Sequence, residues 1–513
     1  MWSKRLLTRS LSLLTALLVL SSAALPGYAE EAGNAEELSP ERVESRVVTV
    51  RFWDPLDCTE YVLEAGDSLT VQPGPEIEGY RFLGWQDAWG NYEKRGTFRL
   101  YEDTDYYAVY AIALQDSAHR AYLAADDAGF AHPWDTVSRR EAALLVYRLL
   151  HTELVGDGSF LDVSKSDPCH DAVATLKTLG ALSGSRFHPN EAITRFELLE
   201  LLSHFYPQAE GSYAFSDLSE SDPAYPVFAL AAEQGWIKEG QARMDDEITR
   251  AEAARIFNRV LGREGDKEQR YELVGTILDL PRSDPYFWDM AEALIPHDSE
   301  LHDGEEYWTK SEALPLREAG PFFIGVRLHY VDESGDIVAD CELDGLTFNS
   351  RGEITSGSEE LDKLIWDAMA AQLDPATMDR EQMLKEMFLY TAHTFHYVGR
   401  NLYEMGETGW ARQEALDMLQ TGRGNCYSFA SVFYYFARAL GYKPEIYSGL
   451  IRGDAGQRRP HGWVEIEIDG EICIFDPEMQ FLNDNAGMND SFYKRGEKFR
   501  SLYGYQRAED IKS

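Results

Sequence analysis

A repeat of about 55 residues constrains the middle of this 513-residue chain more than any other sequence feature. Phe160-Leu-Asp162 returns as Phe215-Ser-Asp217, and Ile193-Thr-Arg-Phe-Glu197 returns as Ile248-Thr-Arg-Ala-Glu252, each 55 positions later. An earlier copy, Val137-Ser-Arg-Arg-Glu141, has a shortened front half. Thr or Ser before Arg-x-Glu forms a capping box, so each motif is expected to start a helix. The period therefore predicts a stacked array of helical units.

These units resemble S-layer homology repeats over residues 113–262. The resemblance implies noncovalent attachment to a secondary polymer of a Gram-positive-type cell wall. By that analogy Arg139, Arg195 and Arg250 are candidates to bind an anionic glycan, because a guanidinium offers a planar pair of donors to a carboxylate. The alternative for each is an ordinary arginine at a helix start that pairs with a nearby glutamate.

A second strong pattern begins at Cys426, which follows the turn sequence Gly422-Arg-Gly-Asn425 and opens an amphipathic run. Apolar residues then recur at spacings of four, three and four, at Phe429, Phe433, Phe436 and Leu440. This spacing predicts a helix lying on a core. Cys426 is therefore expected at a helix N-terminus, where unpaired N–H groups and the helix dipole favour the reactive thiolate.

A hairpin is predicted after this helix. Two strand patterns, His461–Ile468 and Glu471–Asp476, flank Asp469-Gly470, a residue pair favoured in type I′ turns. In that register the numbers of paired residues sum to 939, which puts Trp463 opposite Asp476. His461 shares a face with Trp463 and lies diagonal to Asp476, roughly 7–8 Å away between backbones and within reach of two side chains.

The same alternation assigns roles to the two nearby cysteines. Cys473 falls opposite Ile466, on the other face of the hairpin from His461. We therefore expect Asp476 to orient the imidazole of His461, and Cys426 to be the nucleophile.

Gly424-Asn-Cys426 with its helix, His461-Gly-Trp463 and Phe475-Asp-Pro477 resemble the transglutaminase-like superfamily of papain-type thiol enzymes. The resemblance covers about residues 375–500 and implies an α+β papain-like core. It also implies a Cys–His–Asp triad in which His461 accepts the Cys426 proton, the thiolate attacks an amide carbonyl and an acyl-thioester forms. Water would then give peptide hydrolysis, and an amine would give protein-glutamine acyl transfer.

The oxyanion hole of such a site combines a backbone N–H at the nucleophile with an upstream donor, for which Tyr397 and Trp410 are the candidates. The alternative for Cys426 is a buried cysteine that behaves as a small hydrophobe. The domain would then be a nonenzymatic surface scaffold or binding protein that retains the fold. The intact cysteine, histidine and aspartate favour the enzyme.

The sequence predicts no metal site and no cofactor. His393-Thr-Phe-His396 has helical spacing without an accompanying Glu or Cys pattern. No glycine-rich phosphate loop stands between a strand and a helix pattern.

The first 29 residues have the pattern of a secretory signal peptide, because Lys4, Arg5 and Arg9 precede the apolar stretch Leu11–Leu20 and small residues up to Ala29. We therefore expect an extracellular protein of the cell wall or S-layer. No later run offers about 18 apolar residues, so no membrane span is predicted after signal removal.

Charge and cysteine content limit the partners. The chain has 48 basic and 88 acidic residues and a formal net charge of -40, which argues against nucleic acid or an anionic bilayer as the main partner. The expected partners are the wall polymer and a protein or peptide substrate at the envelope. Five scattered cysteines do not form a disulfide framework, and an odd number leaves one thiol free.

Three segments before the repeats show strand patterns. Val47–Phe52, Gly79–Trp85 and Tyr106–Tyr110 resemble the small β-grasp-like module of internalin-type B repeats. The expected multidomain organisation is a signal peptide (1–29), a linker (30–46), this β module (47–112), three S-layer homology repeats (113–262), a degenerate fourth repeat or linker (263–320), a short β connector (321–357) and a transglutaminase-like catalytic domain (358–513).

Overall fold

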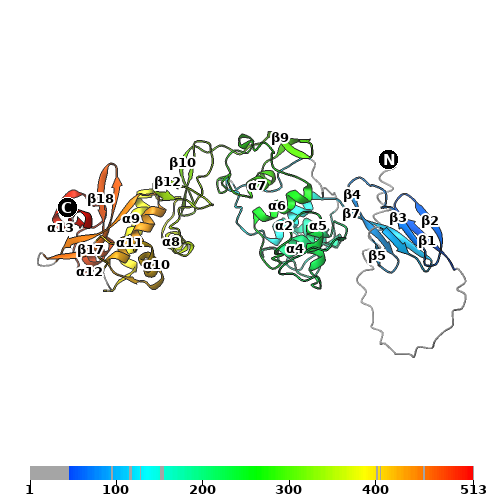
Figure 1. Cartoon of the computed structure of the whole chain (residues 1–513), viewed down its shortest axis with the longest axis horizontal. Coiled ribbons are helices and arrows are strands. Elements are labelled where there is room, and N and C mark those ends of the chain that lie inside the picture. Colours follow the sequence, from blue (N-terminus) through cyan, green and yellow to red (C-terminus); the bar gives the residue numbers. More distant parts are fainter. Residues whose placement is uncertain are drawn as a thin grey trace, which may run out of the picture. The chain divides into compact units, whose positions relative to one another are not determined.

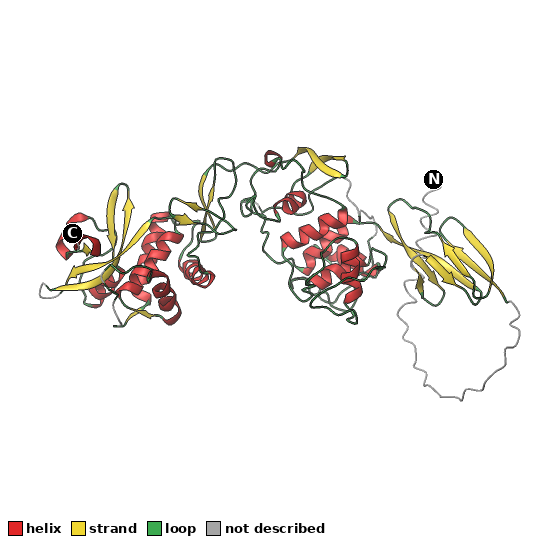
Figure 2. Ribbon diagram, viewed as in Figure 1, coloured by secondary structure: helices red, strands yellow, loops and turns green. Residues whose placement is uncertain are grey.

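The computed structural model describes residues 46–93, 96–114, 118–126, 129–150, 155–399, 403–404, 406–453 and 457–511. The predicted signal peptide, and all of the predicted linker except its last residue, lie outside these residues. The chain divides into two compact units (Figures 1 and 2), one built from residues up to 124, 132–269 and 288–311, the other from 125–131, 270–287 and 312–513. Within the described ranges, every helix is too short or too polar to cross a membrane.

The first unit begins with a mixed β-sheet of strand order β2-β1-β7-β4-β5. β1 (Val47–Trp53) pairs in parallel with β7 (Thr104–Ile112), and the other pairs are antiparallel. Phe52 packs against Trp85 and Tyr106 in the core of this module. The remaining strands are β2 (Cys58–Glu64), β4 (Tyr80–Asp87) and β5 (Tyr92–Glu93), with β3 (Ser68–Val71) and β6 (Gly96–Arg99) in a separate ladder. The predicted strands are found as β1, β4 and β7.

The three Arg-x-Glu motifs each start a helix, as predicted. These helices are α2 (Arg139–Leu149), α4 (Arg195–Ser203) and α6 (Arg250–Leu261). A complete capping box closes each N-terminus, formed by Ser138 with Glu141, Thr194 with Glu197 and Thr249 with Glu252. The boxes satisfy N–H groups that the helix itself leaves unpaired.

The three predicted helical units close into a ring, a feature that the repeat period alone did not predict. The backbone N–H of Val137 donates to the carbonyl of Ile248 (2.9 Å), that of Ile193 to Val137 (2.8 Å), and that of Ile248 to Ile193 (3.2 Å). Each motif thus donates to one neighbour and accepts from the other. Three copies satisfy one another in this way and leave no unpaired edge, whereas an open stack would leave one at each end.

The tripeptide Ser-Asp-Pro occurs at residues 166–168, 221–223 and 283–285, and a helix follows each: α3 (His170–Thr178), α5 (Tyr225–Glu233) and α7 (Phe287–Leu294). α3 packs on α2 and α5 packs on α4, so each covers the helix of the preceding copy. α7 lies in the segment predicted to be a degenerate fourth repeat or a linker, and it hydrogen-bonds to α6 through Asp289, which contacts Arg255 (2.7 Å) and Asn258 (2.9 Å). α7 is thus joined to the last helix of the ring by hydrogen bonds. The hairpin of β8 (His297–His302) and β9 (Glu305–Ser311) follows it.

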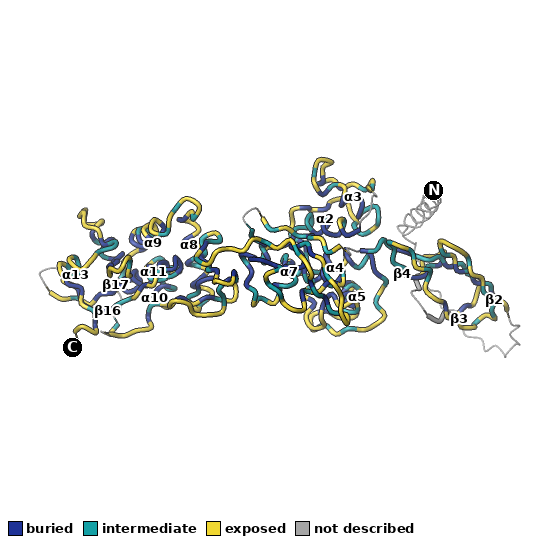
Figure 3. The backbone as a smooth tube through the Cα atoms, turned by 90° about the horizontal axis from the view of Figure 1, so that it is seen from above, coloured by how far each residue is buried: buried dark blue, intermediate teal, exposed yellow. Residues whose placement is uncertain are grey.

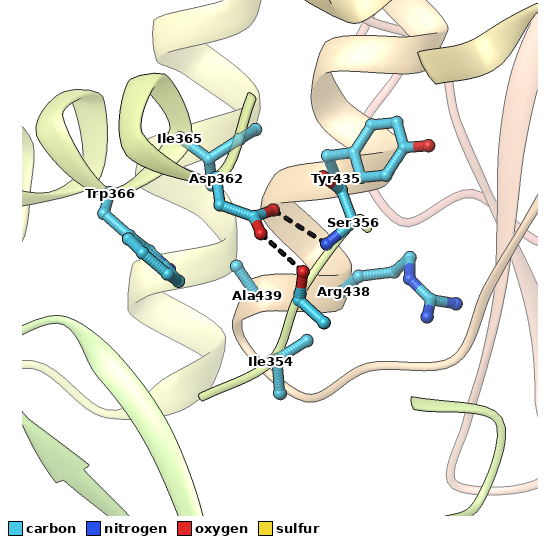
Figure 4. Close-up of a pocket in the computed structure, with 9 residues that line it drawn as sticks. Ile354, Ser356, Asp362, Ile365, Trp366, Tyr435, Arg438 and Ala439 are labelled. Atoms are coloured by element: carbon cyan, nitrogen blue, oxygen red, sulfur yellow. Dashed lines mark hydrogen bonds between the residues drawn. The ribbon is translucent and has the colours of Figure 1, made fainter. Parts of the chain in front are cut away.

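The second unit contains the connector, which forms short hairpins. β10 (Gly320–Ile324) pairs with β11 (Arg327–Val331), and β12 (Glu342–Leu343) pairs with β13 (Leu346–Thr347). This unit also includes the 3-10 helix η2 (Tyr271–Leu273). Asp362 of α8 (Glu359–Gln372) joins the connector to the helices by accepting hydrogen bonds from the Thr355 hydroxyl (2.5 Å) and the Ser356 N–H (2.7 Å). Figure 4 shows this carboxylate in a small pocket where α8 meets Tyr435 and Arg438 of α11, and no cysteine or histidine lines it.

The rest of the second unit packs helices on one antiparallel sheet of order β18-β17-β16-β19. α11 (Cys426–Ala439) lies against β16, β17 and α9, and much of its length is buried (Figure 3). The predicted apolar stripe, which extends to Leu440, is fully buried. The strands are β14 (His396–Tyr397), β15 (Arg423–Gly424), β16 (Pro444–Arg452), β17 (Arg458–Ile468), β18 (Glu471–Phe475) and β19 (Gln506–Arg507). The other helices are α9 (Arg380–Thr394), α10 (Ala411–Thr421), α12 (Pro477–Asn485), α13 (Glu497–Tyr503) and α14 (Ala508–Ile511).

Candidate active site

Cys426 is the first residue of α11, as predicted, and its side chain is 4% exposed. Asn425 caps the helix, because its Oδ1 accepts the backbone N–H groups of Tyr427 (3.1 Å) and Ser428 (3.3 Å). Gly424 leaves room for this turn, since a Cβ there would lie 2.6 Å from Oγ of Ser428. The local sequence therefore holds the thiol at the positive end of a buried helix.

A buried carboxylate fixes the start of α11 to α10. Glu414 accepts hydrogen bonds from the hydroxyls of Ser428 and Tyr403, the latter at 2.7 Å. The ring of Tyr403 also meets Tyr427 edge-on. Sequence reasoning missed Glu414, because a single glutamate in a helical pattern is normally solvated.

The hairpin has the predicted register. Ile468 pairs with Glu471, Ile466 with Cys473 and Val464 with Phe475. Asp469 and Gly470 both have positive φ, of 55° and 82°, as a type I′ turn requires. Cys473 packs in the core on the face of Val464 and Phe475, while Trp463 and Ile474 form the other face.

His461 and Asp476 form the central contact of the site. Nε2 of His461 lies 2.7 Å from Oδ2 of Asp476, and both residues are buried. The carboxylate is held from three directions, because Oδ2 also accepts the Tyr505 hydroxyl (2.6 Å) and Oδ1 accepts the Met479 N–H at the start of α12 (3.0 Å). A carboxylate has no proton to donate, so Nε2 of His461 carries the proton of this hydrogen bond. Nδ1 of His461 is then the ring nitrogen that can interact with Cys426.

Burial lowers the pKa of His461, but the charge of Asp476, its hydrogen bond and a hydrogen bond with the Cys426 side chain together raise that pKa well above its usual range. A proton that leaves the Cys426 thiol is therefore favoured on the imidazole of His461. Cys426 and Asp476 thus both act on the imidazole of His461, which is the set of partners that nucleophilic thiol chemistry requires.

Two further residues of this site were not predicted. Oε2 of Glu478 lies 3.9 Å from Nδ1 of His461, is buried, and has no hydrogen-bond partner among the described residues. Burial raises the pKa of Glu478, and the positive charge of His461 opposes that shift. For Tyr505, burial and then the charge of Asp476 raise the pKa well above its usual range. His461, Asp476 and Glu478 also offer ligand atoms within 4.8 Å of one another.

The two predicted oxyanion donors differ in availability. Tyr397 of β14 pairs with Gly424 of β15, and Gly424 precedes Cys426 by two positions in the sequence. Tyr397 is 41% exposed. Burial and then the charge of Cys426 raise the pKa of Tyr397, so its hydroxyl keeps a proton to donate. Nε1 of Trp410 donates instead to the Glu407 carbonyl at 2.8 Å. Its side-chain N–H is therefore bound to Glu407, and the role of Trp410 as an oxyanion donor stays a prediction.

The three predicted polymer-binding arginines stand at the starts of α2, α4 and α6. Arg139 forms an ion pair with Glu197, and Arg250 forms one with Glu141 at 3.3 Å. Both partners are capping-box residues of a neighbouring repeat. These two arginines therefore join repeats, as the alternative reading allowed, and the backbone N–H of Arg195 donates to Asp246 of the next repeat (2.9 Å).

Comparison with known proteins gives two family matches. Residues 367–477 match the model of the Transglutaminase-like superfamily, and residues 159–199 match that of the S-layer homology domain. The chain thus contains a transglutaminase-like domain and an S-layer homology domain. The second domain implies binding to a cell-wall polymer.

Two relatives and one solved structure are similar over part of the chain. Surface-layer 125 kDa protein of Lysinibacillus sphaericus is 30% identical over 161 residues, which cover 29% of this chain and 14% of the relative. Cell surface glycoprotein 1 of Acetivibrio thermocellus is 25% identical over 217 residues, which cover 37% of this chain and 9% of the relative. A structure named "Putative Cysteine Protease" from Cytophaga hutchinsonii is 18% identical, covers 23% of this chain and 37% of its own, and has a TM-score of 0.18. The relatives and the S-layer homology domain indicate a location at the cell surface.

Proposed function

For a chain that carries a transglutaminase-like domain and an S-layer homology domain, we propose an exported thiol enzyme anchored to the cell wall of a Gram-positive-type bacterium. It acts on amide or peptide bonds at the envelope, as a cysteine peptidase or a protein-glutamine acyltransferase. Cys426 is the nucleophile, His461 the acid–base group and Asp476 the residue that orients the imidazole. The observation that carries this proposal is that the His461 ring contacts both Cys426 and Asp476.

In the first step His461 takes the thiol proton, and the Cys426 sulfur attacks the amide carbonyl carbon. The tetrahedral oxyanion is stabilised by a hydrogen bond from the Tyr397 hydroxyl. The C–N bond then breaks, the leaving amine takes the proton from His461, and the acyl group remains on sulfur as a thioester.

In the second step water or an amine attacks the thioester. His461 accepts a proton from the attacking group, the C–S bond breaks, and the proton returns to the thiolate. Water yields a carboxylic acid, whereas an amine yields a new amide. Asp476 keeps Nδ1 of His461 directed at sulfur in both steps, since its own two oxygens are held by Tyr505 and the start of α12.

Labelling with a thiol-directed acyl probe at near-neutral pH tests the enzyme. We expect Cys426 to react at least ten times faster than free cysteine, and Cys426→Ala to lose the label. Cys473→Ala is the matched control, because this buried cysteine lies on the other face of the hairpin. Labelling of Cys426 no faster than free cysteine would instead support the nonenzymatic scaffold. Mass analysis of products from envelope peptides and proteins, with and without an amine donor, distinguishes hydrolysis from acyl transfer.

Anchoring is tested separately by cosedimentation of the full-length protein with cell-wall sacculi. Binding should disappear after the secondary polymer is extracted, and binding that survives extraction would contradict the proposal. Arg139→Gln, Arg195→Gln and Arg250→Gln are each expected to weaken binding. Thermal unfolding must accompany this series, because Arg139 and Arg250 also join neighbouring repeats.

A further inference from the structure

Four potential metal ligands converge in the first unit, from four separate segments of the chain. They are His119, Glu292 of α7, His297 of β8 and Glu306 of β9, and each offers a ligand atom within 4.8 Å of the others. Glu292, His297 and Glu306 are buried, and His119 is partly exposed. His119, His297 and Glu306 also line a surface pocket, which gives a small ion access from solvent.

The spacing of these atoms fits a tetrahedral ion. Nδ1 of His119 lies 3.0 Å from Nε2 of His297 and 3.1 Å from Oε1 of Glu306. Nε2 of His297 lies 3.3 Å from Oε1 of Glu306 and 3.2 Å from Oε1 of Glu292. Zinc bonds to nitrogen and oxygen of about 2.0–2.2 Å place neighbouring tetrahedral ligands about 3.3–3.6 Å apart. The side chains are thus close to coordinating positions without rearrangement.

The surroundings orient the ligands as metal sites commonly do. The other ring nitrogen of His297, Nδ1, donates to the Ile295 carbonyl at 2.9 Å, so Nε2 carries the lone pair of the neutral ring. Trp308 stacks on that ring with centroids 3.8 Å apart. Its Nε1 also donates to Oε1 of Glu292 (2.8 Å), and the backbone N–H of Glu264 donates to Oε2 of Glu306 (3.0 Å).

Hydrogen bonding within the cluster leaves a buried oxygen unsatisfied. Only one proton fits between Nδ1 of His119 and Nε2 of His297, so the two rings cannot both be protonated at these atoms. Oε2 of Glu292 is buried, has no hydrogen-bond partner among the described residues, and lies 3.7 Å from Nδ1 of His119. Arg263 adds positive charge near His119, and its Nη1 donates to the Arg120 carbonyl. A cation between the four side chains would satisfy this oxygen and accept both nitrogen lone pairs.

We propose that His119, Glu292, His297 and Glu306 bind one divalent transition-metal ion of the zinc type. Two imidazoles and two carboxylates form a donor set suited to zinc, and four protein ligands make a closed, structural site. His119 and His297 are 178 positions apart, so the ion fastens the segment before α2 to the hairpin that follows α7. Closing so long a loop should stabilise the folded unit.

The test uses the full-length protein with Cys426→Ala, so that the thiol of the candidate active site cannot contribute a ligand. After removal of metal with a chelator, Zn²⁺ is titrated calorimetrically and thermal unfolding is followed. We expect one ion per chain and a higher unfolding temperature in its presence. His297→Gln and Glu292→Gln should weaken the affinity more than the roughly 10–100-fold loss caused by removing an outer-shell partner. His302→Gln is the matched control, because it lies exposed on the same strand.

The spectrum of the Co²⁺-loaded protein distinguishes an ion bound by this cluster from an ion bound by the remaining cysteines. Co²⁺ held by nitrogen and oxygen should give the visible spectrum of a tetrahedral ion without a thiolate charge-transfer band. If His297→Gln does not fold, His119→Gln replaces it, since this partly exposed ring can be exchanged with less loss of packing. A zinc stoichiometry unchanged by the cluster substitutions, a thiolate band, or the absence of binding would overturn the proposal and leave an ion-free hydrogen-bonded network.

Discussion

Oδ2 of Asp476 lies 2.7 Å from Nε2 of His461, although the paired part of the hairpin ends one residue earlier, at Phe475. Asp476 leaves the strand to cap α12, and this change of direction turns its carboxylate toward the imidazole. Tyr505 then holds the same oxygen from a segment 29 positions further along the chain. The orientation of His461 therefore depends on a helix cap as much as on the sheet.

Asp476→Asn should slow the reaction of Cys426 with iodoacetamide at near-neutral pH by about 10²-fold. The amide keeps the size of the carboxylate and loses its charge, so burial then dominates and lowers the pKa of His461. Alkylation rates and the NMR titration of the His461 ring measure the two effects. Asp484→Asn is a matched control, because Asp484 of α12 pairs with His393 at 2.8 Å on the surface. If Cys426 were alkylated at the same rate in Asp476→Asn and Asp484→Asn, this result would contradict the role of Asp476 in orienting His461.

Glu478→Gln should become progressively more stable than the unsubstituted protein as the pH rises above about 4.3, the ordinary pKa of a glutamate. The folded-state pKa of Glu478 is raised, mainly by burial, so the native state binds this proton more tightly than the unfolded state. Stability is then lost as the pH rises through the folded-state pKa, whereas glutamine has no proton to lose. Urea unfolding across this range should show a relative change on the order of 1 kcal/mol. Glu467→Gln, at an exposed position on β17, should show no such trend.

Tyr397→Phe should reduce the rate at which p-nitrophenyl acetate acylates Cys426 by about 10²-fold, the usual effect of losing one oxyanion donor. Alkylation by iodoacetamide should be unchanged, because that reaction forms no oxyanion. Trp410→Phe should leave the ratio of the two rates unchanged, since the indole N–H is bound to the Glu407 carbonyl. If Tyr397→Phe lowered the acylation rate and the alkylation rate by the same factor, the cause would be a loss of packing and not the loss of an oxyanion donor.

The parts of the site that could be predicted from sequence are those governed by local periodicity. A two-residue turn fixes the pairing of every later residue in a hairpin, so the placement of Cys473 away from His461 followed from counting. The apolar stripe after Cys426 likewise defined α11 and its start. Glu414, Glu478 and Tyr505 could not be found in this way, because tertiary packing brings them to the site and no spacing connects them to the nucleophile.

The repeats show the same division between local and tertiary information. The Arg-x-Glu motif predicted three helix starts and their caps. The period did not reveal the ring, because closure depends on the angle between successive copies and on backbone bonds between Val137, Ile193 and Ile248. His119 and His297, at 178 positions apart, have no motif spacing that would have associated them.

Gly424→Ala should destabilise the second unit by about 1–3 kcal/mol and reduce the reactivity of Cys426. A Cβ at this position would lie 2.6 Å from Oγ of Ser428 and 2.9 Å from Sδ of Met418, so α10 and α11 would have to separate. Ser428 donates to Glu414 and receives the Asn425 N–H, so its displacement would disturb the cap that presents the thiol. Gly496→Ala is the control, because a Cβ there meets no atom within 4 Å and the residue has φ of -90°. If Gly424→Ala and Gly496→Ala show equal changes in the free energy of unfolding and in the rate of alkylation by iodoacetamide, the close packing at Gly424 does not position Cys426.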